Sequence, residues 1–454
     1  MRGGRIPGVR AARGLRVGAV LVALVAVPAW PGDGAVAGAA VGAGGGGAAA
    51  DGGPYAYRFA KGAVAVRGAP TPTQAPTLAA GGVYRDAVPG DGTRVYRLDL
   101  DDRSGAYVSA VAVPPPTARV GIAEGVAVSI RDPGGRVCGF REARFGTAAF
   151  PRPLAASAGR TVTEGASACR RAGTYLAVVE RLGGEGGVAG AGDWQVELRY
   201  EREPALRGGV PSGAGEGSSA PVDGNEGDGG SDAGPGGGEP GVRVGGGGFS
   251  EAAALASGEW DDRIEPGQSR FYRVPVDWGQ RVSARVAGGA LAVTLHNPVQ
   301  GMVAAAETVA ASPGRPMAAE LPVLPPVRYE NRYGAESPDG RTRPGDVRFA
   351  GWYYLVVSAR PETAGTGPYG LRLSVRVTGA ARPGPGYEGP PGVFTVTDAD
   401  RRAAAPATAA PASSAAGRPG MRLLATAAFG TGTALLVGLA GWTLVARRRA
   451  RGAH

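Results

Sequence analysis

Histidine is almost absent from this 454-residue chain, and its scarcity limits the chemistry that we expect. His296 is the only histidine apart from the terminal His454, so neither a Ser-His-Asp or Cys-His arrangement nor a zinc site has the residues it needs. We interpret His296 as a solvent-facing strand residue. No pattern selects a pair of carboxylates for glycoside cleavage. We therefore expect no catalytic activity, no cofactor and no metal, with a cryptic extracellular hydrolase as one alternative.

Cysteine is equally scarce. Cys138 and Cys169 are the only two, and both lie in the first half of the chain. An exported chain meets oxidising conditions, so we expect them to pair. A closed loop of about 32 residues would stabilise the fold by roughly 3–4 kcal/mol in the chain-entropy view. A two-cysteine metal site, the alternative, lacks further His or Cys partners.

The amino-terminal segment lacks an Arg-Arg pair, and no cysteine follows its apolar run. These absences disfavour twin-arginine export and a lipoprotein. The run at residues 17–27 is too short to span a bilayer and follows five basic residues, Arg2, Arg5, Arg10, Arg13 and Arg16. Residues 1–39 therefore indicate a secretory signal peptide, with cleavage after Ala37 or Ala39.

A second apolar segment near the other end carries no charge over 24 residues, from Leu423 to Ala446. About 20 apolar residues cover the hydrocarbon layer, so residues 423–446 predict one transmembrane helix; a buried core helix is the alternative. The residues that follow are basic, namely Arg447, Arg448, Arg449 and Arg451. The tail 447–454 is then cytoplasmic and everything before the helix is extracellular. No Leu-Pro-x-Thr-Gly motif supports sortase attachment.

Lysine is nearly missing too, since Lys61 is the only one. With abundant Gly and Ala, the use of arginine instead suggests a high-GC bacterial genome. The formal charge of +10 includes nine arginines in the two ends, so residues 17–446 carry about +1. Because the net charge of residues 17–446 is close to zero, this part of the chain lacks the excess of basic residues that attracts a polyanion. We therefore expect no nucleic acid partner.

The chain contains two copies of one sequence unit. Pro89-Gly90-Asp91-Gly92-Thr93-Arg94-Val95-Tyr96-Arg97 is matched by Pro266-Gly267-Gln268-Ser269-Arg270-Phe271-Tyr272-Arg273. Gly173-Thr174-Tyr175-Leu176-Ala177-Val178-Val179 is matched by Gly351-Trp352-Tyr353-Tyr354-Leu355-Val356-Val357. The two copies therefore predict the same fold.

Short strands with turns between them make up each copy. Residues 194–201 alternate between apolar and polar side chains, as a half-buried strand requires, and further strands are expected at 95–100, 107–113, 126–131 and 174–180. No stretch between the termini has apolar residues at helical spacing. The sequence predicts an all-β protein with two tandem β-sandwich, jelly-roll-like domains at 78–200 and 251–379. The segment at 299–348 has no assigned place.

The remaining segments have little to bury. Residues 40–77 are expected to be unstructured, and the Gly-rich linker 201–250 has a span of about 40 Å as a flexible coil, which would let the domains move independently. The Pro- and Ala-rich segment 380–420 predicts a semi-extended stalk.

The repeated motifs carry a family resemblance. The second copy has Ile264-Glu265-Pro266-Gly267-Gln268-Ser269-Arg270-Phe271-Tyr272-Arg273-Val274 and Gly351-Trp352-Tyr353-Tyr354-Leu355-Val356-Val357, and both copies have a Leu/Ile-x-Asp/Asn-Pro pattern. This pattern resembles the bacterial pre-peptidase C-terminal (PPC) domain, in two tandem divergent copies. The resemblance implies a jelly-roll β-sandwich that serves as an accessory or adhesive module beside an exported enzyme.

Two groups of residues are candidates for binding. Asp99, Asp101 and Asp102 form a compact acidic cluster, and some PPC domains bind calcium; we favour a solvated turn, because calcium needs six to eight oxygen ligands. Trp278 lies in the predicted hairpin Val276-Asp277-Trp278-Gly279-Gln280 and is the candidate exposed ligand contact.

These features together predict a non-catalytic, single-pass cell-envelope protein. Its two domains would bind another envelope protein or a wall polymer, and its carboxyl-terminal helix would lie in the cytoplasmic membrane. The alternative is an accessory ectodomain in a membrane complex with a separately encoded enzyme or sensor.

Overall fold

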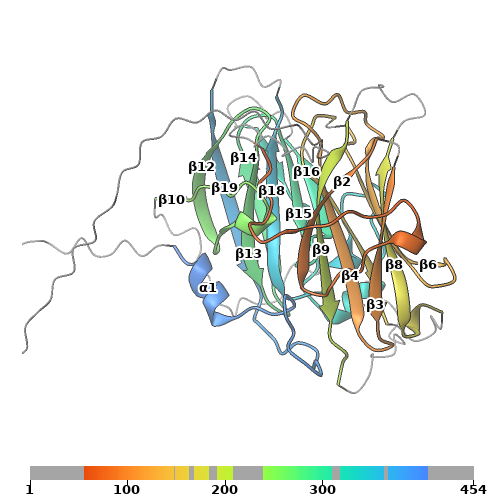
Figure 1. Cartoon of the computed structure of the whole chain (residues 1–454). Helices are drawn as coiled ribbons and strands as arrows, with labels where there is room; N and C mark the ends of the chain where they lie inside the picture. The colour runs from red at the N-terminus through yellow and green to blue at the C-terminus, as the bar shows by residue number, and fades with distance from the viewer. Residues whose placement is uncertain are drawn as a thin grey trace, which may run out of the picture. The chain divides into compact units, whose positions relative to one another are not determined.

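Strands dominate the folded part of the chain. The computed structural model describes residues 56–90, 92–147, 149–162, 168–183, 192–207, 239–308, 317–361 and 367–406. These residues form four sheets, two in each repeat. In Figure 1 the strands of the first repeat run from red to yellow-green, and those of the second from green to blue. The expected all-β class is confirmed.

The first repeat pairs a five-stranded sheet, β1-β2-β9-β4-β7, with a four-stranded sheet, β3-β8-β5-β6. Its elements are β1 (Val64–Ala65), η1 (Pro72–Gln74), β2 (Gly82–Val88), β3 (Thr93–Leu100), β4 (Gly105–Val113), β5 (Gly125–Arg131), β6 (Val137–Arg144), β7 (Leu154–Arg160), η2 (Ala168–Arg170), β8 (Gly173–Leu182) and β9 (Trp194–Glu203). The inward side chains of the two sheets form one apolar core.

The second repeat pairs two five-stranded sheets, β10-β12-β19-β14-β17 and β11-β13-β18-β15-β16. Its elements are β10 (Gly241–Val242), η3 (Phe249–Glu251), β11 (Ala253–Ala254), β12 (Gly258–Ile264), β13 (Ser269–Val276), β14 (Arg281–Ala287), β15 (Leu291–His296), β16 (Met302–Glu307), β17 (Ala318–Glu320), η4 (Tyr329–Tyr333), η5 (Pro344–Asp346), β18 (Gly351–Ala359) and β19 (Tyr369–Thr378). Helix α1 (Asp398–Ala404) follows.

Strand order shows that the repeat is real. The order β2-β9-β4-β7 matches β12-β19-β14-β17, and β3-β8-β5-β6 matches β13-β18-β15-β16. The expected strands of the first copy correspond to β3, β4, β5, β8 and β9, while β2, β6 and β7 were not predicted. Exposed edge residues along β6 and small residues along β7 hide the alternation. Their counterparts β16 and β17, together with η4 and η5, lie within the unassigned segment 299–348.

A buried tyrosine explains the shared Arg-x-Tyr-Arg motif. The hydroxyl of Tyr272 donates to Oδ2 of Asp262 at 2.6 Å, and Gly245 N donates to the same oxygen at 2.8 Å. In the first repeat Tyr96 donates to Oδ2 of Asp86 at 2.7 Å. The motif therefore joins the two sheets of each sandwich through a hydrogen-bonded carboxylate.

The expected disulfide between Cys138 and Cys169 is present, with 5.6 Å between the Cα atoms. It joins the edge strand β6 to η2. The fully buried guanidinium of Arg160 holds the same region, because it donates to the carbonyl oxygens of Cys169 at 2.6 Å, Ser104 at 2.6 Å and Asp101 at 2.7 Å. Backbone carbonyls thus satisfy this buried cation.

The two repeats pack against each other instead of moving independently. All of β4 except Val113 is buried, although only one of its faces points into its own sandwich. On the other face, Val111 packs in a cluster with Phe271 and Tyr354 of the second repeat. Nearby, Ser109 Oγ donates to Oε1 of Gln300 at 2.7 Å. The outer face of sheet β1-β2-β9-β4-β7 therefore lies on sheet β11-β13-β18-β15-β16.

The segment before the first sandwich was expected to be unstructured, but residues 56–77 are folded. The Tyr57 hydroxyl donates to Oε1 of Glu197 at 3.0 Å, and Ala60 N donates to Oε2 of the same residue at 2.7 Å. Arg58 N donates to Gly247 O of the second repeat at 2.9 Å. The segment therefore contacts both repeats.

The predicted linker and stalk also differ from expectation where they are described. Residues 201–207 and 239–250 of the linker belong to the fold, and residues 208–238 lie outside the described residues. In the stalk, Phe394 is 1% exposed, and Arg207 N donates to Gly386 O at 2.7 Å. Trp352 Nε1 donates to Oδ1 of Asp400, in α1, at 3.0 Å. Apolar residues within this Pro-rich stretch give it something to bury.

Replacing both cysteines, as Cys138→Ala with Cys169→Ala, should lower the free energy of unfolding by about 3–4 kcal/mol, because the unfolded chain gains loop entropy. Urea denaturation of the two proteins measures this difference. An unchanged midpoint would show that the contacts of Arg160 alone hold η2.

The substitution Val111→Asp should separate the repeats, since it places a carboxylate without a partner in the interface and costs about 3–5 kcal/mol. Small-angle scattering should show a larger radius of gyration, and thermal unfolding should split into two transitions. Arg285→Asp is the matched control, because Arg285 is an exposed residue of β14, the strand of the second repeat that corresponds to β4. Equal behaviour of the two variants would contradict the interface.

Candidate functional site

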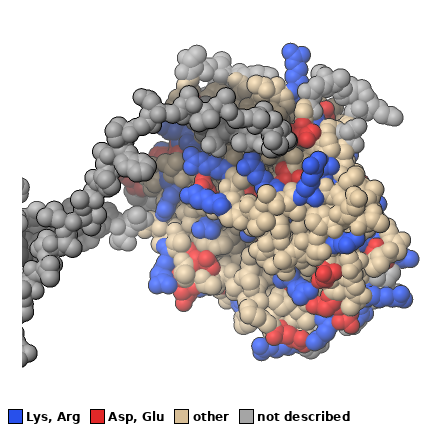
Figure 2. Space-filling model, in the orientation of Figure 1, with Lys and Arg blue, Asp and Glu red and all other residues tan. Residues whose placement is uncertain are grey.

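Charge is mixed on the surface. Basic and acidic side chains are interspersed over the face shown in Figure 2. That face presents no continuous block of one sign. Because this face has no patch of one charge, a pocket is the better candidate for a binding site.

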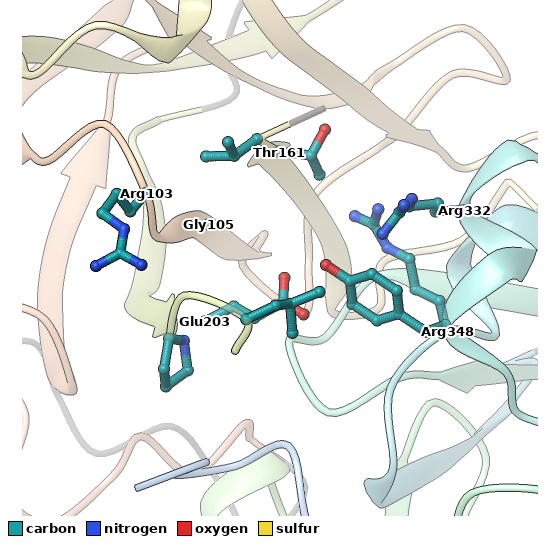
Figure 3. A pocket seen from close by; sticks show the side chains of 10 residues that line it. Arg103, Gly105, Thr161, Glu203, Arg332 and Arg348 are labelled. Carbon is teal, nitrogen blue, oxygen red and sulfur yellow. The ribbon is translucent and has the colours of Figure 1, made fainter. Parts of the chain in front are cut away.

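One pocket of about 20 Å³ lies where the two repeats meet. That volume is close to the space of one water molecule. Figure 3 shows Arg103 and Glu203 on one side of it and Arg332 and Arg348 on the other, with Thr161 above. The full lining consists of Arg103, Gly105, Thr161, Val162, Glu203, Pro204, Leu206, Tyr329, Arg332 and Arg348. We call it the junction pocket.

Glu203 is the only acidic residue of the lining and is 5% exposed. It ends β9, where the alternating pattern turns its side chain toward the second repeat. Tyr107 donates to its Oε2 at 2.7 Å, and Tyr387 donates to its Oε1 at 3.0 Å. Burial raises the pKa of the Glu203 carboxyl, while the charge of Arg348 acts in the opposite direction. The Glu203 carboxylate thus links β9 to β4, through Tyr107, and to the segment at 380–406, through Tyr387.

Arg348 supplies the opposite charge. Its Nη2 donates to the Tyr107 hydroxyl at 3.4 Å, and its Nε is buried without a hydrogen-bond partner in the described part of the chain. Burial alone would lower the pKa of Arg348, but Tyr107 and Glu203 raise it above its ordinary value. Arg348 therefore stays charged inside the wall of the pocket.

Aromatic rings complete the wall on the side of the second repeat. The guanidinium of Arg332 lies 4.3 Å from the ring centre of Tyr329 and 4.7 Å from that of Tyr333. Both contacts are within the range of cation–π attraction. Tyr333 is 53% exposed, so its ring lies at the surface next to Arg332.

Sequence reasoning missed the junction pocket. Its side chains come from loop residues Arg103 and Arg348, the end of β9 and the short helix η4, which are far apart in sequence. Only one signal was available, the acidic residue Glu203 just beyond the predicted strand 194–201. Which residues meet there depends on how the repeats pack.

The structure corrects the expected exposure of Trp278, which is 7% exposed and belongs to the core of the second repeat. The start of the predicted stalk covers it. Arg382 N donates to Trp278 O at 2.9 Å, and a Cβ placed on Gly384 would lie 2.2 Å from the indole Nε1. The indole is therefore not available as a surface contact.

Each predicted calcium residue lies in or next to the turn after β3. Oδ1 of Asp101 accepts hydrogen bonds from the amides of Arg103 at 2.9 Å and Ser104 at 2.6 Å. Partial burial raises its pKa, but these hydrogen bonds lower the pKa overall. Asp99 instead accepts from Thr174 at 3.0 Å, and Asp102 is exposed. No group of three potential metal ligands is found among the described residues.

His296 is buried rather than solvent-facing, with 4% of its surface exposed. Its Nε2 lies 2.9 Å from Thr294 Oγ1, and its Nδ1 lies 3.1 Å from Gln300 O. The strand register shifts between Leu295 and His296, and Ala292 of β15 packs against Phe150 of the first repeat. Burial lowers the pKa of His296 to about 4, so the ring is neutral near pH 7.

The expected membrane anchor, which includes Leu423, Ala446, Arg447, Arg448 and Arg449, lies outside the described residues, as does the expected signal peptide. Within the described residues, no helix is long and apolar enough to cross a membrane.

No family model matches the chain, and no curated protein matches it. One similar solved structure is a protein of Eubacterium rectale described as secreted; it is 6% identical, covers 69% of this chain and 81% of its own, and has a TM-score of 0.17. Another is the N-terminal CBM22-1–CBM22-2 tandem domain of Xyn10C from Paenibacillus barcinonensis, 9% identical, covering 65% of this chain and 93% of its own, with a TM-score of 0.16. Both TM-scores are too low to assign a fold or a function.

The neutral burial of His296 predicts a pH-dependent stability. The unfolded state takes up a proton near pH 6.5 and the folded state only near pH 4, so this residue's contribution is complete above pH 6.5 and falls by roughly 3 kcal/mol on acidification to pH 4. Urea denaturation of the wild type and of His296→Gln across this range isolates the effect, since other titrating groups cancel. A constant difference between the two proteins would contradict the buried neutral ring.

Proposed function

We propose that the protein is a non-catalytic, single-pass cell-envelope protein that presents two PPC-like jelly-roll domains outside the cytoplasmic membrane. The signal peptide at 1–39, the helix at 423–446 and the basic tail that starts at Arg447 support this placement. The domains bind an envelope protein or a wall polymer.

One observation carries the proposal: the two repeats and the segments at 56–77 and 380–406 form one continuous packed body. Tyr57 before the first repeat and Tyr387 after the second each hydrogen-bond a buried glutamate of β9. Such a body holds surface groups in fixed relative positions, which lowers the ordering cost of binding. The polar atoms of His296 and Glu203 are engaged within the fold, which supports a structural role for them.

Crosslinking in intact cells, followed by purification of the full-length protein, tests the proposal. We expect a specific protein or wall fragment to be captured, because the repeats lie outside the membrane. The control chain lacks residues 78–379 but keeps the signal, the membrane segment and the tail, and it should capture nothing. Recovery of no specific material by the full-length protein would refute a binding role.

Capture that persists with the control chain would favour the accessory-subunit alternative, in which the membrane helix holds the complex together. The envelope-binding function and the accessory-subunit alternative therefore differ in whether capture requires the two repeats.

A further inference from the structure

The outer face of sheet β10-β12-β19-β14-β17 is largely exposed, whereas the corresponding sheet of the first repeat packs against the second repeat. These strands lie at the left of Figure 1. Outward side chains alternate with buried ones along them. The outward basic residues are Arg263, Arg281, Arg285, Arg372 and Arg376. The outward acidic residues are Glu259, Asp261 and Glu320. We call this surface the arginine face.

Two of the acids on the arginine face already have partners on it. Nε of Arg372 donates to Oδ1 of Asp261 at 2.9 Å, and its Nη2 donates to Oδ2 at 3.1 Å. Glu259 accepts a hydrogen bond from Oγ of Ser374 at 2.6 Å. The pair of Arg372 and Asp261 is therefore satisfied and adds no available charge.

Three further arginines of the face lack such partners. Arg376 lies opposite Ser283 in the register, so Arg281 and Arg285 are its diagonal neighbours at roughly 7–8 Å. Their side chains make no hydrogen bond or ion pair within the described part of the chain. Glu320 lies opposite Arg285 and offsets one charge. This end of the face therefore has a positive charge that the described residues do not neutralise.

We propose that the arginine face binds the acidic segment 208–238 of the same chain, which lies outside the described residues. This segment has no basic residue, and its acidic residues are Glu216, Asp223, Glu226, Asp228 and Asp232. A single exposed ion pair contributes little, but several charges on each side act together. The charges of the segment and of the face are therefore complementary.

The segment enters the sheet close to these arginines. Strand β10 runs parallel to β12, with Gly241 beside Trp260, so the chain that leads into β10 comes from the end of β12 at Gly258. Gly258 pairs with Val375, the neighbour of Arg376 in β19. The carboxyl end of the segment therefore meets the sheet at the end where the arginines lack partners.

The segment is also long enough to reach these arginines. Asp232, its last acid, lies seven residues before Glu239, which is a stretch of up to about 23 Å at roughly 3.3 Å per residue. Strands β10 and β14 are three strand spacings apart in the sheet, or about 14 Å. The covalent connection keeps the acids near the face at a high effective concentration.

Carbodiimide crosslinking of the purified full-length protein tests this proposal, because the reaction joins an amine to a carboxylate in contact with it. Lys61 is the only lysine, so Arg376→Lys adds an amine to the face and keeps the charge there. We expect mass spectrometry to find the new amine joined to an acid of segment 208–238. The yield should fall about fivefold in 1 M salt, where the Debye length is about 3 Å.

Two controls accompany this measurement. Lys61 lies 3.9 Å from Glu251, and the link between them reports that the reaction works in each low-salt sample. Arg136→Lys places an amine at an exposed position of the first repeat and should give no link to the segment. Equal linkage by Arg136→Lys, or links of the Arg376→Lys amine to Glu259 or Glu320 alone, would overturn the proposal.

Charge dependence separates binding from mere nearness. Adding Arg281→Gln and Arg285→Gln to the Arg376→Lys protein keeps the covalent connection but removes two charges, so the yield should fall about threefold. Adding Arg136→Gln and Arg170→Gln instead removes two exposed charges elsewhere and should leave the yield unchanged. Equal yields in the two proteins would show that the connection alone brings the segment to the face, which would refute binding.

A mixture of isotopically labelled and unlabelled protein shows which chain supplies the acids. We expect links within one copy only, and links between copies would reject the same-chain assignment. Neither result bears on the envelope-binding function, which the capture experiment tests separately.

Discussion

The packing of one sheet from each repeat against the other is the constraint on which the rest of the structure depends. Strand β4 has apolar side chains on both faces, and so does β18. Each strand can bury only one face within its own sandwich, so the second face needs another sheet. Because the repeats meet through these faces, residues such as Val111 and Phe271 leave water together.

This packing also explains the buried polar groups at the junction. Glu197 and Glu203 lie on β9 and would face solvent in an isolated sandwich. In the packed body each accepts hydrogen bonds from a tyrosine of a terminal segment, Tyr57 for one and Tyr387 for the other. Buried carboxylates without such donors would destabilise the fold, so residues 56–77 and 380–406 are part of it. The junction pocket is the space that remains where these contacts end.

Local pattern was enough to predict the main strands and the repeat. Alternation over residues 194–201 matches β9, and the paired motifs around Tyr96 and Tyr272 mark equivalent positions in the two sandwiches. The disulfide followed from there being two cysteines in a chain that was expected to be exported. His296 was misplaced because alternation gives the face of a strand but not what covers that face. Trp278 was misplaced because its place in a turn does not reveal that residues 382–384 cover it. The continuous apolar runs in β4 and β18 were the available sign that both faces are buried.

The sequence alone therefore determined the strands, their duplication and the pairing of Cys138 with Cys169, since these depend on side-chain periodicity and on the chemistry of single residues. Only the tertiary structure decided that the repeats share an interface, that residues 380–406 fold onto them, and that Glu203, Arg348 and Tyr387 meet. Those contacts join residues far apart in the chain. Their formation depends on the match between two whole surfaces, which no short stretch of sequence contains.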